Sequence, residues 1–246
     1  MRHPKPHVLL GVASSIAKAQ RLVVITGAGM SAESGIPTFR GDGGLWRNFN
    51  AENLASVKGF ANNPELVWTW YDERRLQMLT CEPNAAHKAL VEIEQQGIPI
   101  TIVTQNVDNL HQLAGSSNVI PIHGNILGVR CVKTNEKWKH EGIHSELPPK
   151  CKCGSIIRPD VLWFGEEYDM GMYSHAQQAI LNADVILVIG TSWSIGAVFY
   201  MISESFAEVI EFNLEHTDLS PSVHKTVLGP IGVVLPAIVN LIKRMD

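Results

Sequence analysis

The chain has few cysteines, and the four among its 246 residues form no dense pairing pattern. This argues against a disulfide framework and for a reducing compartment, so we expect a cytoplasmic protein. An excess of charge of one sign is also lacking, because the net charge is only −4. We therefore expect no nucleic-acid partner. The 45% of hydrophobic and 18% of charged residues are ordinary for a soluble globular protein with its own core.

Long hydrophobic runs are lacking as well. The apolar stretches 185–189 and 229–242 are too short to cross a membrane, and prolines interrupt the second. Near the N-terminus, Arg2 and Lys5 precede an apolar stretch over residues 8–17, which is compatible with a targeting segment. Its apolar residues recur every three or four positions, however, and this spacing favours a first helix. We expect no membrane association.

Strand and helix patterns alternate along most of the chain. Short runs rich in β-branched residues predict strands at 22–26, 101–103, 119–122, 185–189 and 209–212. Apolar residues at helical spacing predict helices at 85–96, 107–113, 174–182, 197–206 and 231–244. Such alternation predicts an α/β fold, with a doubly wound parallel sheet that helices cover on both faces.

Two stretches break this alternation. Residues 42–80 have a helical pattern and carry three of the tryptophans, whereas residues 124–159 are rich in Lys, Glu and His and hold three of the four cysteines. Both are interpreted as insertions that leave the sheet and return to it. The length of 246 residues fits a large α/β domain with such a smaller addition.

The most informative motif follows the first predicted strand. The strand at 22–26 runs into Gly27-Ala28-Gly29, where bare backbone N–H groups without a Cβ nearby can approach a phosphate. A Gly-x-Gly alone is weak support for a nucleotide site. The residues that follow make the motif specific, and they resemble the signature of the sirtuins, the NAD-dependent protein lysine deacylases: Ser31, Glu33, Gly35-Ile36-Pro37, Phe39 and Arg40.

The resemblance covers roughly residues 8–245. It implies a Rossmann-like NAD-binding domain made of residues 1–41, 81–123 and 160–246. It also implies a small second domain made of the insertions 42–80 and 124–159, with NAD and substrate in the cleft between the two domains. The residues that would bind NAD near the first strand are Gly27, Ala28, Gly29, Ser31, Glu33, Phe39 and Arg40.

The sequence Gln105-Asn106-Val107-Asp108 comes directly after the second predicted strand. Ligands of open α/β sheets bind beyond the carboxyl ends of the strands, so these polar residues are candidates for a site. Taken alone, the motif could equally be a helix start with Asn106 or Asp108 as its cap. The sirtuin resemblance implies that Asn106 and Asp108 hold the nicotinamide end of NAD and an ordered water, and that Gln105 contacts the nicotinamide ribose.

His123 is the candidate general base. It ends the next predicted strand, before Gly124, at the position of the sirtuin catalytic base. Imidazole has a reference pKa near ~6.5 and can accept a proton at neutral pH. A single histidine is more often structural, and His87 and His111, which lie on predicted helices, are interpreted that way. The resemblance implies catalytic roles for His123 and Asn106.

Two further strand ends carry polar residues. Gly190-Thr191-Ser192 is interpreted as a phosphate- or ribose-binding turn, and Asn213-Leu214-Glu215 as the group that holds the adenine ribose in sirtuins. Ile231, at the start of the last predicted helix, completes the candidate NAD-binding residues.

A dehydrogenase would need an acidic residue about 20 positions after its glycines. That distance reaches Glu52, which lies in the helical insertion, so the pattern disfavours hydride transfer.

Tyr71 and Arg74 are the clearest indication of the substrate. They lie three residues apart on a predicted helix that begins at Pro64, and this spacing places both on one face. An exposed arginine beside a partly buried tyrosine is common on helices, so the pair could be incidental. A phenol and a guanidinium together can nonetheless bind a carboxylate. The pair resembles the one in desuccinylase-type sirtuins, which remove succinyl, malonyl or glutaryl groups from lysine.

Residues 161–166 resemble the sirtuin segment that binds the substrate peptide as an added strand. The peptide would pair through backbone hydrogen bonds, so side-chain specificity should be modest and acylated-lysine proteins in general are the expected partners. The candidate residues are Val161, Trp163, Phe164, Gly165 and Glu166.

The cysteines depart from the sirtuin pattern, in which two Cys-x-x-Cys pairs hold a structural zinc. Thr134 stands where the partner of Cys131 should be, and Cys151 and Cys153 are separated by a single residue. Because structural zinc takes four ligands, the three cysteines fall short unless His140 or His144 supplies the fourth. Either these cysteines bind zinc, or the site has decayed and the module is held by packing. The distant Cys81 is interpreted as a buried apolar residue.

We therefore expect an NAD-dependent protein lysine deacylase with a preference for acidic acyl chains, which yields nicotinamide and O-acyl-ADP-ribose. Three alternatives remain open: a plain deacetylase in which Tyr71 and Arg74 are incidental, a mono-ADP-ribosyltransferase, and a non-catalytic module that binds NAD or ADP-ribose. The sequence does not indicate an oligomeric state, since it shows no heptad pattern.

Overall fold

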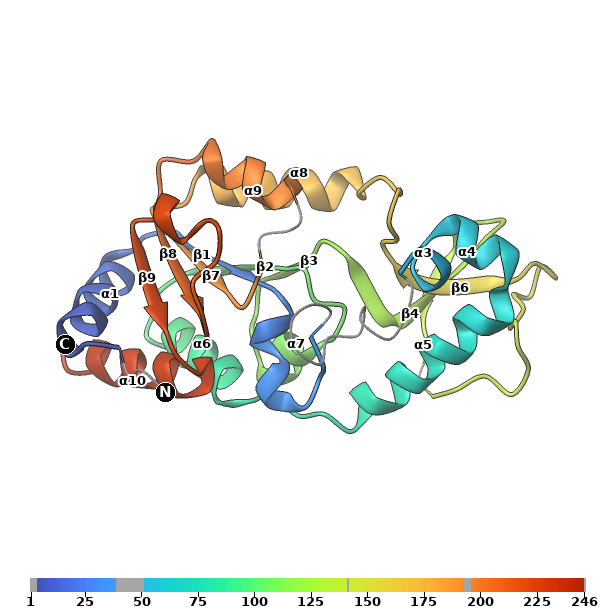
Figure 1. Ribbon diagram of the computed structural model, residues 1–246, viewed down its shortest axis with the longest axis horizontal. Coiled ribbons are helices and arrows are strands. Elements are labelled where there is room, and N and C mark those ends of the chain that lie inside the picture. Colours follow the sequence, from blue (N-terminus) through green and yellow to red (C-terminus); the bar gives the residue numbers. More distant parts are fainter. Residues whose placement is uncertain (1–3, 39–50, 141, 193–195, 246) are drawn as a thin grey trace.

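The computed structural model describes residues 4–38, 51–140, 142–192 and 196–245. Within these residues the strands form a six-stranded sheet and, at the other end of the molecule, a three-stranded sheet (Figure 1). This is the predicted arrangement of a Rossmann-like sheet with a small second domain, and the predicted fold class is confirmed. The exact residue boundaries between the two domains stay a prediction.

The large sheet is entirely parallel and has the strand order β3-β2-β1-β7-β8-β9. Numbered along the chain within this sheet, the order is the 3-2-1-4-5-6 of dinucleotide-binding folds, and it reverses between β1 and β7. A ligand is expected at this switch point, beyond the carboxyl ends of the strands. The strands are β1 (Leu22–Thr26), β2 (Ile100–Thr104), β3 (Val119–Pro121), β7 (Val185–Ile189), β8 (Glu208–Asn213) and β9 (Lys225–Leu228).

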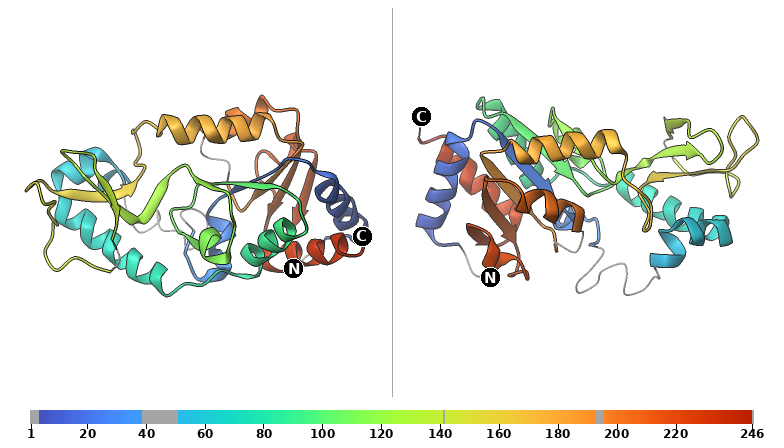
Figure 2. Two further views of the ribbon diagram at one scale, coloured as in Figure 1. Left: turned by 180° about the vertical axis from the view of Figure 1, so that it is seen from behind. Right: turned by 90° about the horizontal axis from the view of Figure 1, so that it is seen from above.

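Helices cover both faces of this sheet, because its central strands are apolar on both sides. All five residues of β1 are buried, with Leu22 and Val24 in one core and Val23 and Ile25 in the other. The first core is closed by helices α1 (Pro6–Lys18), α6 (Ala85–Gln95) and α10 (Ile231–Ile242). The second is closed by α8 (Met170–Leu181) and α9 (Gly196–Ser203), which lie on the opposite side of the sheet (Figure 2).

The small domain combines three helices with the antiparallel sheet β5-β4-β6. A third core, around the fully buried Trp68, joins these helices to the sheet. The indole N–H of Trp68 on α5 donates to the backbone oxygen of Ile157 on β6 over 2.8 Å and fixes that packing. The elements are α3 (Ala51–Leu54), α4 (Val57–Asn62), α5 (Pro64–Leu79), β4 (Gly124–Cys131), β5 (Lys137–Lys139) and β6 (Ile157–Val161).

Short elements complete the fold, and some of them differ from expectation. They are the 3-10 helices η1 (Ala28–Met30), η2 (Ala32–Ser34) and η3 (Ser220–Ser222) and the helix α7 (Leu110–Ala114). The helix expected at 107–113 begins only at Leu110, whose N–H donates to the Asp108 side chain over 3.1 Å. Strands β4, β5, β6 and β9 were not predicted. β5 and β9 have only three and four residues, whereas β4 contains two glycines and β6 a proline, which weaken a strand pattern.

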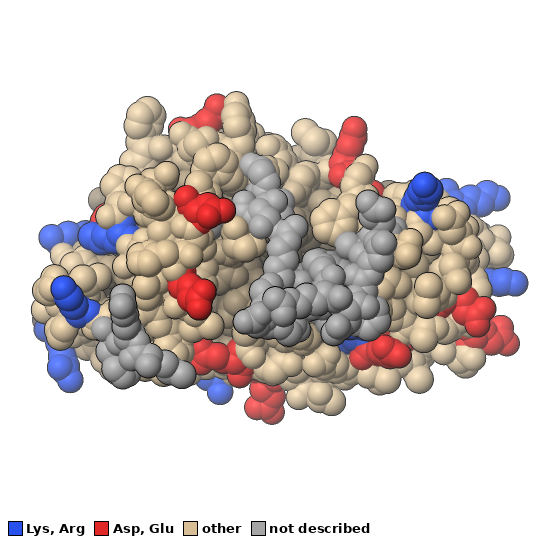
Figure 3. Space-filling model, in the orientation of Figure 1, with Lys and Arg blue, Asp and Glu red and all other residues tan. Residues whose placement is uncertain are grey.

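None of the helices in the described part of the chain combines the length and the apolar character that crossing a membrane requires. On the face shown in Figure 3, basic and acidic side chains are scattered among uncharged residues.

Candidate active site

The loops that follow β1 and β7 pack against each other at the switch point. The N–H groups of Gly27 and Gly29 donate to the backbone oxygens of Ile189 and Gly190, over 2.9 and 2.8 Å. A Cβ on Gly190, whose φ is +61°, would lie 2.5 Å from the backbone nitrogen of Met30. The N–H groups of Gly27 and Gly29 therefore both have acceptors within the protein, and the approach of this turn to a phosphate stays a prediction. These glycines serve the contact between the loops, and NAD binding by them stays a prediction.

Three of the predicted NAD-site residues form one buried cluster at the ends of β1 and β2. The side-chain amide of Asn106 donates to the Oγ of Ser31 over 3.1 Å and to the backbone oxygen of Gly27 over 3.0 Å. Ser31 in turn donates to the Oδ2 of Asp108 over 2.8 Å. Burial raises the pKa of Asp108, while hydrogen bonds from Leu110 and Ser31 oppose that rise. Asp108 also accepts from the N–H of Leu110, but the N-cap of α7 is Asn109, so the interpretation of Asn106 or Asp108 as the helix cap is wrong. Contact of Asp108 with NAD stays a prediction.

His123 lies beside this cluster, two residues after the end of β3. Its Nδ1 is 2.8 Å from the backbone oxygen of Gln105, and its side chain is buried. Burial lowers the pKa of His123, and the contact with Gln105 only partly offsets this effect. The Tyr168 ring lies nearby, with a centroid distance of 5.9 Å. The structure therefore places the candidate base beside Gln105. Because its pKa is lowered, the His123 ring is neutral at ordinary pH.

A hydrogen-bonded chain that was not predicted lies beneath the cluster. Thr26 and Thr104, which are paired in register at the ends of β1 and β2, have their hydroxyls 2.9 Å apart. The Oγ1 of Thr104 accepts from the N–H of Asn106 over 3.0 Å, and the Oγ1 of Thr26 lies 3.0 Å from the Nε2 of His111. A threonine at the last position of two neighbouring strands was the signal in the sequence that could have revealed this chain.

His87 and His111 are buried next to each other, with ring centroids 4.8 Å apart. Burial lowers the pKa of His87 to about 4. Burial and, to a lesser extent, the neighbouring His87 lower the pKa of His111 to about 3. Both rings are therefore neutral at ordinary pH, and their buried positions agree with the structural role expected of them.

At the end of β8, Asn213 is bound to the neighbouring loop. Its Nδ2 donates to the backbone oxygen of Thr191 over 3.1 Å, so the loops after β7 and β8 are joined. Thr191 is buried, whereas Ser192, Leu214 and Glu215 are exposed beside them. The structure thus places these residues at the carboxyl end of the sheet, where the adenine ribose of NAD is predicted to bind.

Glu33 makes a contact that the sequence did not indicate. Its Oε1 accepts from the N–H of Gly232 over 2.9 Å, at the start of α10 and next to Ile231. A carboxylate in this position stabilises the N-terminus of a helix. A side chain on Gly232 would collide with Glu33, since its Cβ would lie 2.3 Å from Oε2. Direct contact of Glu33 or Ile231 with NAD stays a prediction, and Phe39 and Arg40 lie outside the described residues.

Tyr71 and Arg74 share one side of α5, as predicted from their spacing. The Tyr71 hydroxyl accepts from the indole Nε1–H of Trp163 over 2.9 Å. The Arg74 guanidinium lies 3.8 Å from the centroid of the Trp70 ring and donates to the backbone oxygen of Trp70 over 3.1 Å. Burial raises the pKa of Tyr71 to about 12, and nearby positive charges, Arg74 among them, oppose this rise. Tyr71 is therefore a neutral phenol close to a cation.

Glu166 binds residues of the chain itself. It pairs with Arg158 through two contacts, of 2.5 Å from Nη1 and 2.9 Å from Nη2, and it accepts from the backbone N–H of Trp163 over 2.8 Å. Burial opposes its ionisation, but the hydrogen bonds from Arg158 and Trp163 outweigh that effect and lower the pKa of Glu166. The side chain of Glu166 therefore orders the 161–166 segment, and contact with a peptide substrate stays a prediction.

The remaining residues of this segment lie around that ion pair. Val161 ends β6, and the next N–H, that of Leu162, donates to the backbone oxygen of His123 over 2.9 Å. Phe164 is about half exposed, and Gly165 adopts a φ of +83° that favours glycine. The predicted substrate segment is therefore hydrogen-bonded directly to the backbone of His123, the candidate general base.

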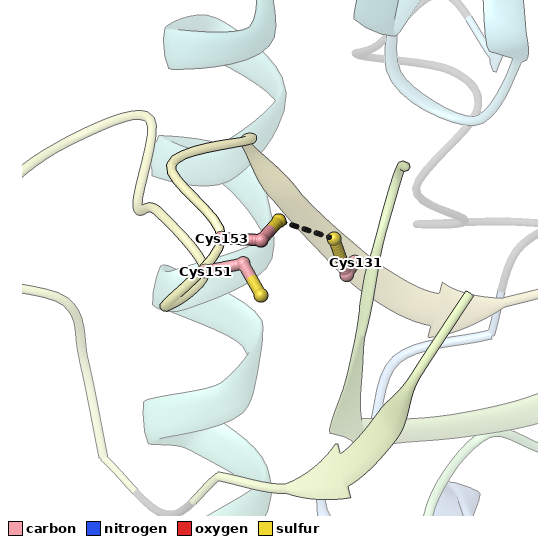
Figure 4. Close-up of side chains that lie close together, drawn as sticks. All are labelled: Cys131, Cys151 and Cys153. Atoms are coloured by element: carbon pink, nitrogen blue, oxygen red, sulfur yellow. Dashed lines mark hydrogen bonds between the residues drawn. The ribbon is translucent and has the colours of Figure 1, made fainter. Parts of the chain in front are cut away.

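The three cysteines of the second insertion lie together (Figure 4). The Sγ atoms of Cys131, Cys151 and Cys153 are within 4.8 Å of one another, and those of Cys131 and Cys153 are 3.5 Å apart. Hydrogen bonds from Thr134, whose N–H lies 3.4 Å from the Cys131 Sγ, lower the pKa of Cys131 to about 6. Cys81, expected to be buried, is instead half-buried, near the start of the loop that precedes α6.

No fourth ligand joins these cysteines among the described residues. His144 contacts Asp72 instead, with its Nδ1 3.4 Å from Oδ1, and stacks on His140 at a centroid distance of 4.1 Å. Because a structural zinc needs four ligands, the described residues offer only an incomplete site.

Comparisons with known proteins agree with this geometry. The Sir2 family profile matches residues 27–197. An NAD-dependent protein deacylase of Pyrococcus abyssi is 42% identical over 248 residues, which cover 97% of this chain and 99% of the relative. A solved complex of a Sir2 homologue with NAD has a TM-score of 0.90 and 39% identity, covering 100% of this chain and 97% of that chain.

A Sir2 protein bound to a myristoylated histone peptide is also similar, with a TM-score of 0.78 and 30% identity over 98% of each chain. The family match spans more than half of the sequence, and it includes the loops after β1, β2 and β7 that meet at the switch point. Because the family match covers this region and the relatives are similar over nearly their full length, the chain belongs to the Sir2 family.

Proposed function

We propose that this Sir2 protein removes acidic acyl groups, such as succinyl, malonyl and glutaryl, from lysine side chains of proteins in a reaction that consumes NAD. Family membership and the deacylase names of its relatives support NAD-dependent deacylation. The observation that carries the acidic preference is the placement of the Tyr71 phenol and the Arg74 guanidinium on one side of α5. Its four free cysteines suit a reducing compartment such as the cytoplasm.

The residues at the switch point fit NAD, because buried polar groups and a neutral imidazole converge at the carboxyl ends of β1, β2 and β3. When bound, NAD supplies a ribose carbon that nicotinamide leaves and that becomes bonded to the acyl oxygen. The Asn106 amide and the Asp108 carboxylate, held through Ser31, would orient the nicotinamide end. The Nε2 of His123 would accept a proton from a ribose hydroxyl, because its Nδ1 is committed to Gln105.

An acidic acyl chain needs two kinds of partner at its end. The Arg74 guanidinium supplies a positive charge and a fork of donors that matches a carboxylate. The pKa of Tyr71, raised to about 12, keeps its phenol protonated and able to donate a hydrogen bond at neutral pH. A neutral acyl group such as acetyl would leave both groups without a carboxylate partner, which is the basis of the proposed selectivity.

The first experiment is to incubate the purified protein with NAD and one peptide that carries acetyl-, succinyl- or glutaryl-lysine, and to identify the products by mass spectrometry. Succinyl or glutaryl removal that outpaces acetyl removal, with formation of O-acyl-ADP-ribose, is the expected result. Efficient removal of acetyl alone would refute the acidic preference. A peptide that gains ADP-ribose would indicate a transferase, and NAD binding without release of nicotinamide would indicate a binding module.

A further inference from the structure

Trp163 makes the closest polar contact to the phenol of Tyr71 among the described residues. The indole Nε1–H donates to the Tyr71 oxygen over 2.9 Å, although the two residues are 92 positions apart in the sequence. Both side chains are nearly excluded from solvent, with exposed fractions of 2% for Trp163 and 3% for Tyr71. Water therefore does not compete with this hydrogen bond, and the bond defines the orientation of the phenol.

The direction of this hydrogen bond is fixed by chemistry. An indole N–H can only donate, so the phenol oxygen must be the acceptor. A phenol O–H prefers to lie in the plane of its ring, where it has two orientations. Acceptance from Trp163 uses one in-plane position of the oxygen, and the O–H of Tyr71 is left at the other. The phenol is thereby presented as a donor in a single direction.

The indole of Trp163 is itself held in place from several sides. The guanidinium carbon of Arg158 lies 3.3 Å from the centroid of its ring, and the Phe60 ring packs against it with a centroid distance of 5.2 Å. Glu166 accepts from the Trp163 backbone N–H and pairs with Arg158 at the same time. Trp163 therefore has little freedom to turn its N–H away from Tyr71.

We propose that Trp163 is a positioning residue for acyl selectivity, and that its indole N–H orients the Tyr71 hydroxyl as a donor to the carboxylate of an acidic acyl chain. This inference rests on the proposed function, because it concerns the carboxylate that Arg74 would bind. It assigns to the Trp163 side chain a task distinct from the backbone pairing with peptide that is predicted for the 161–166 segment.

The test compares kcat/KM for succinyl- and acetyl-lysine peptides in Trp163→Phe, which keeps an aromatic ring but removes the donor. We expect the succinyl-to-acetyl ratio to fall about three- to tenfold, the effect of losing one oriented hydrogen bond. Trp68→Phe is the matched control, because it removes a buried indole donor, to Ile157, from the same core. It should leave the ratio unchanged.

Two results would contradict the proposals. A ratio that is unchanged in Trp163→Phe, while Arg74→Met lowers it, would overturn the role of Trp163 and leave the proposed function intact. A ratio that neither variant changes would overturn both. If Trp163→Phe fails to fold, benzothienylalanine at position 163 keeps the shape of the indole without its N–H, and the same fall in ratio is expected.

Discussion

The Nδ1 of His123 lies 2.8 Å from the backbone oxygen of Gln105. A carbonyl oxygen only accepts, so the Nδ1 carries the proton, and in the neutral ring the Nε2 is the basic nitrogen. Gln105 is itself a predicted NAD-binding residue at the end of β2, so one backbone contact joins the candidate base to the candidate cofactor site. The tautomer that a general base needs is therefore set by the fold.

Replacing His123 with Ala should abolish deacylation while the protein still folds and binds NAD. Because burial lowers the pKa of His123, the base stays neutral below its ordinary pKa of 6.5. The acid limb of kcat/KM against pH should accordingly lie below pH 6.5. Near-normal turnover of the variant, measured as nicotinamide release, would remove His123 from its catalytic role.

Replacing Arg74 with Met should lower kcat/KM for a succinyl-lysine peptide by about 10- to 100-fold, the cost of one charged hydrogen-bonded contact. Deacetylation should change far less, because acetyl offers no carboxylate. Arg74→Lys, which keeps the charge but loses the planar fork, should give an intermediate value. Equal losses on both substrates would indicate a structural arginine.

Much of the fold and of the candidate site could be predicted, because their signals are local. A β-branched run followed by glycines or polar residues marks the end of a buried strand, and all parallel strand ends lie at one edge of the sheet. This reasoning placed Asn106, Asp108, His123 and Asn213 at the carboxyl edge, where the structure has them. The sirtuin resemblance predicted that NAD binds at this edge of the sheet.

The contacts that could not be predicted join residues far apart in the sequence. Glu33 and Gly232 are separated by 199 positions, and Tyr71 and Trp163 by 92. Sequence patterns show which residues are polar or apolar. They do not show which distant residue will form a hydrogen bond with a given buried polar group. For this reason the contact of Glu33 with Gly232 and the hydrogen bond between Trp163 and Tyr71 were both missed.

Gly190→Ala should destabilise the protein by about 1–2 kcal/mol or more and weaken NAD binding. The residue has a left-handed φ of +61°, and its Cβ would lie 2.5 Å from the backbone of Met30. Gly11→Ala is the control, because Gly11 lies within α1 and its Cβ would meet only the Lys225 side chain at 3.9 Å. That variant should be about 0.5–1 kcal/mol more stable, as urea unfolding can measure.

The stability of the protein should fall as the pH drops from 7 to 5. The pKa values of His87 and His111 are lowered to about 4 and about 3, so the unfolded chain binds protons in this range that the folded chain does not. Stability is therefore present above the unfolded pKa and is lost as the pH falls below it. Each histidine should contribute roughly 2 kcal/mol to this loss between pH 7 and 5.

His87→Leu tests this pH dependence, because neither ring nitrogen of His87 has a hydrogen-bond partner among the described residues. Urea unfolding of the variant should lack the roughly 2 kcal/mol of pH dependence that His87 contributes between pH 7 and 5, with no loss of stability at pH 7. His216→Gln, at an exposed position, controls for removing a histidine. An unchanged pH dependence in His87→Leu would contradict the assignment.

Thr134→Cys should convert the cysteine cluster into a complete zinc site. The wild-type cluster supplies three sulfur atoms within 4.8 Å of one another, and the Thr134 N–H already lies 3.4 Å from the Cys131 Sγ. A fourth thiolate at position 134 would complete the tetrahedral set that structural zinc requires, and metal binding would then add to folding stability. Elemental analysis should find one zinc per chain in the variant after treatment with a chelator.

Any zinc that the wild-type protein binds should be removed by the same treatment, because three ligands hold the metal more weakly than four. Cys81→Ser should behave like the wild type, since Cys81 is not part of the cluster. A wild-type protein that keeps one zinc per chain through the chelator would show that a ligand outside the described residues, or a water, completes the site. A wild-type protein that holds no zinc even before the chelator would mean that packing alone maintains the small domain.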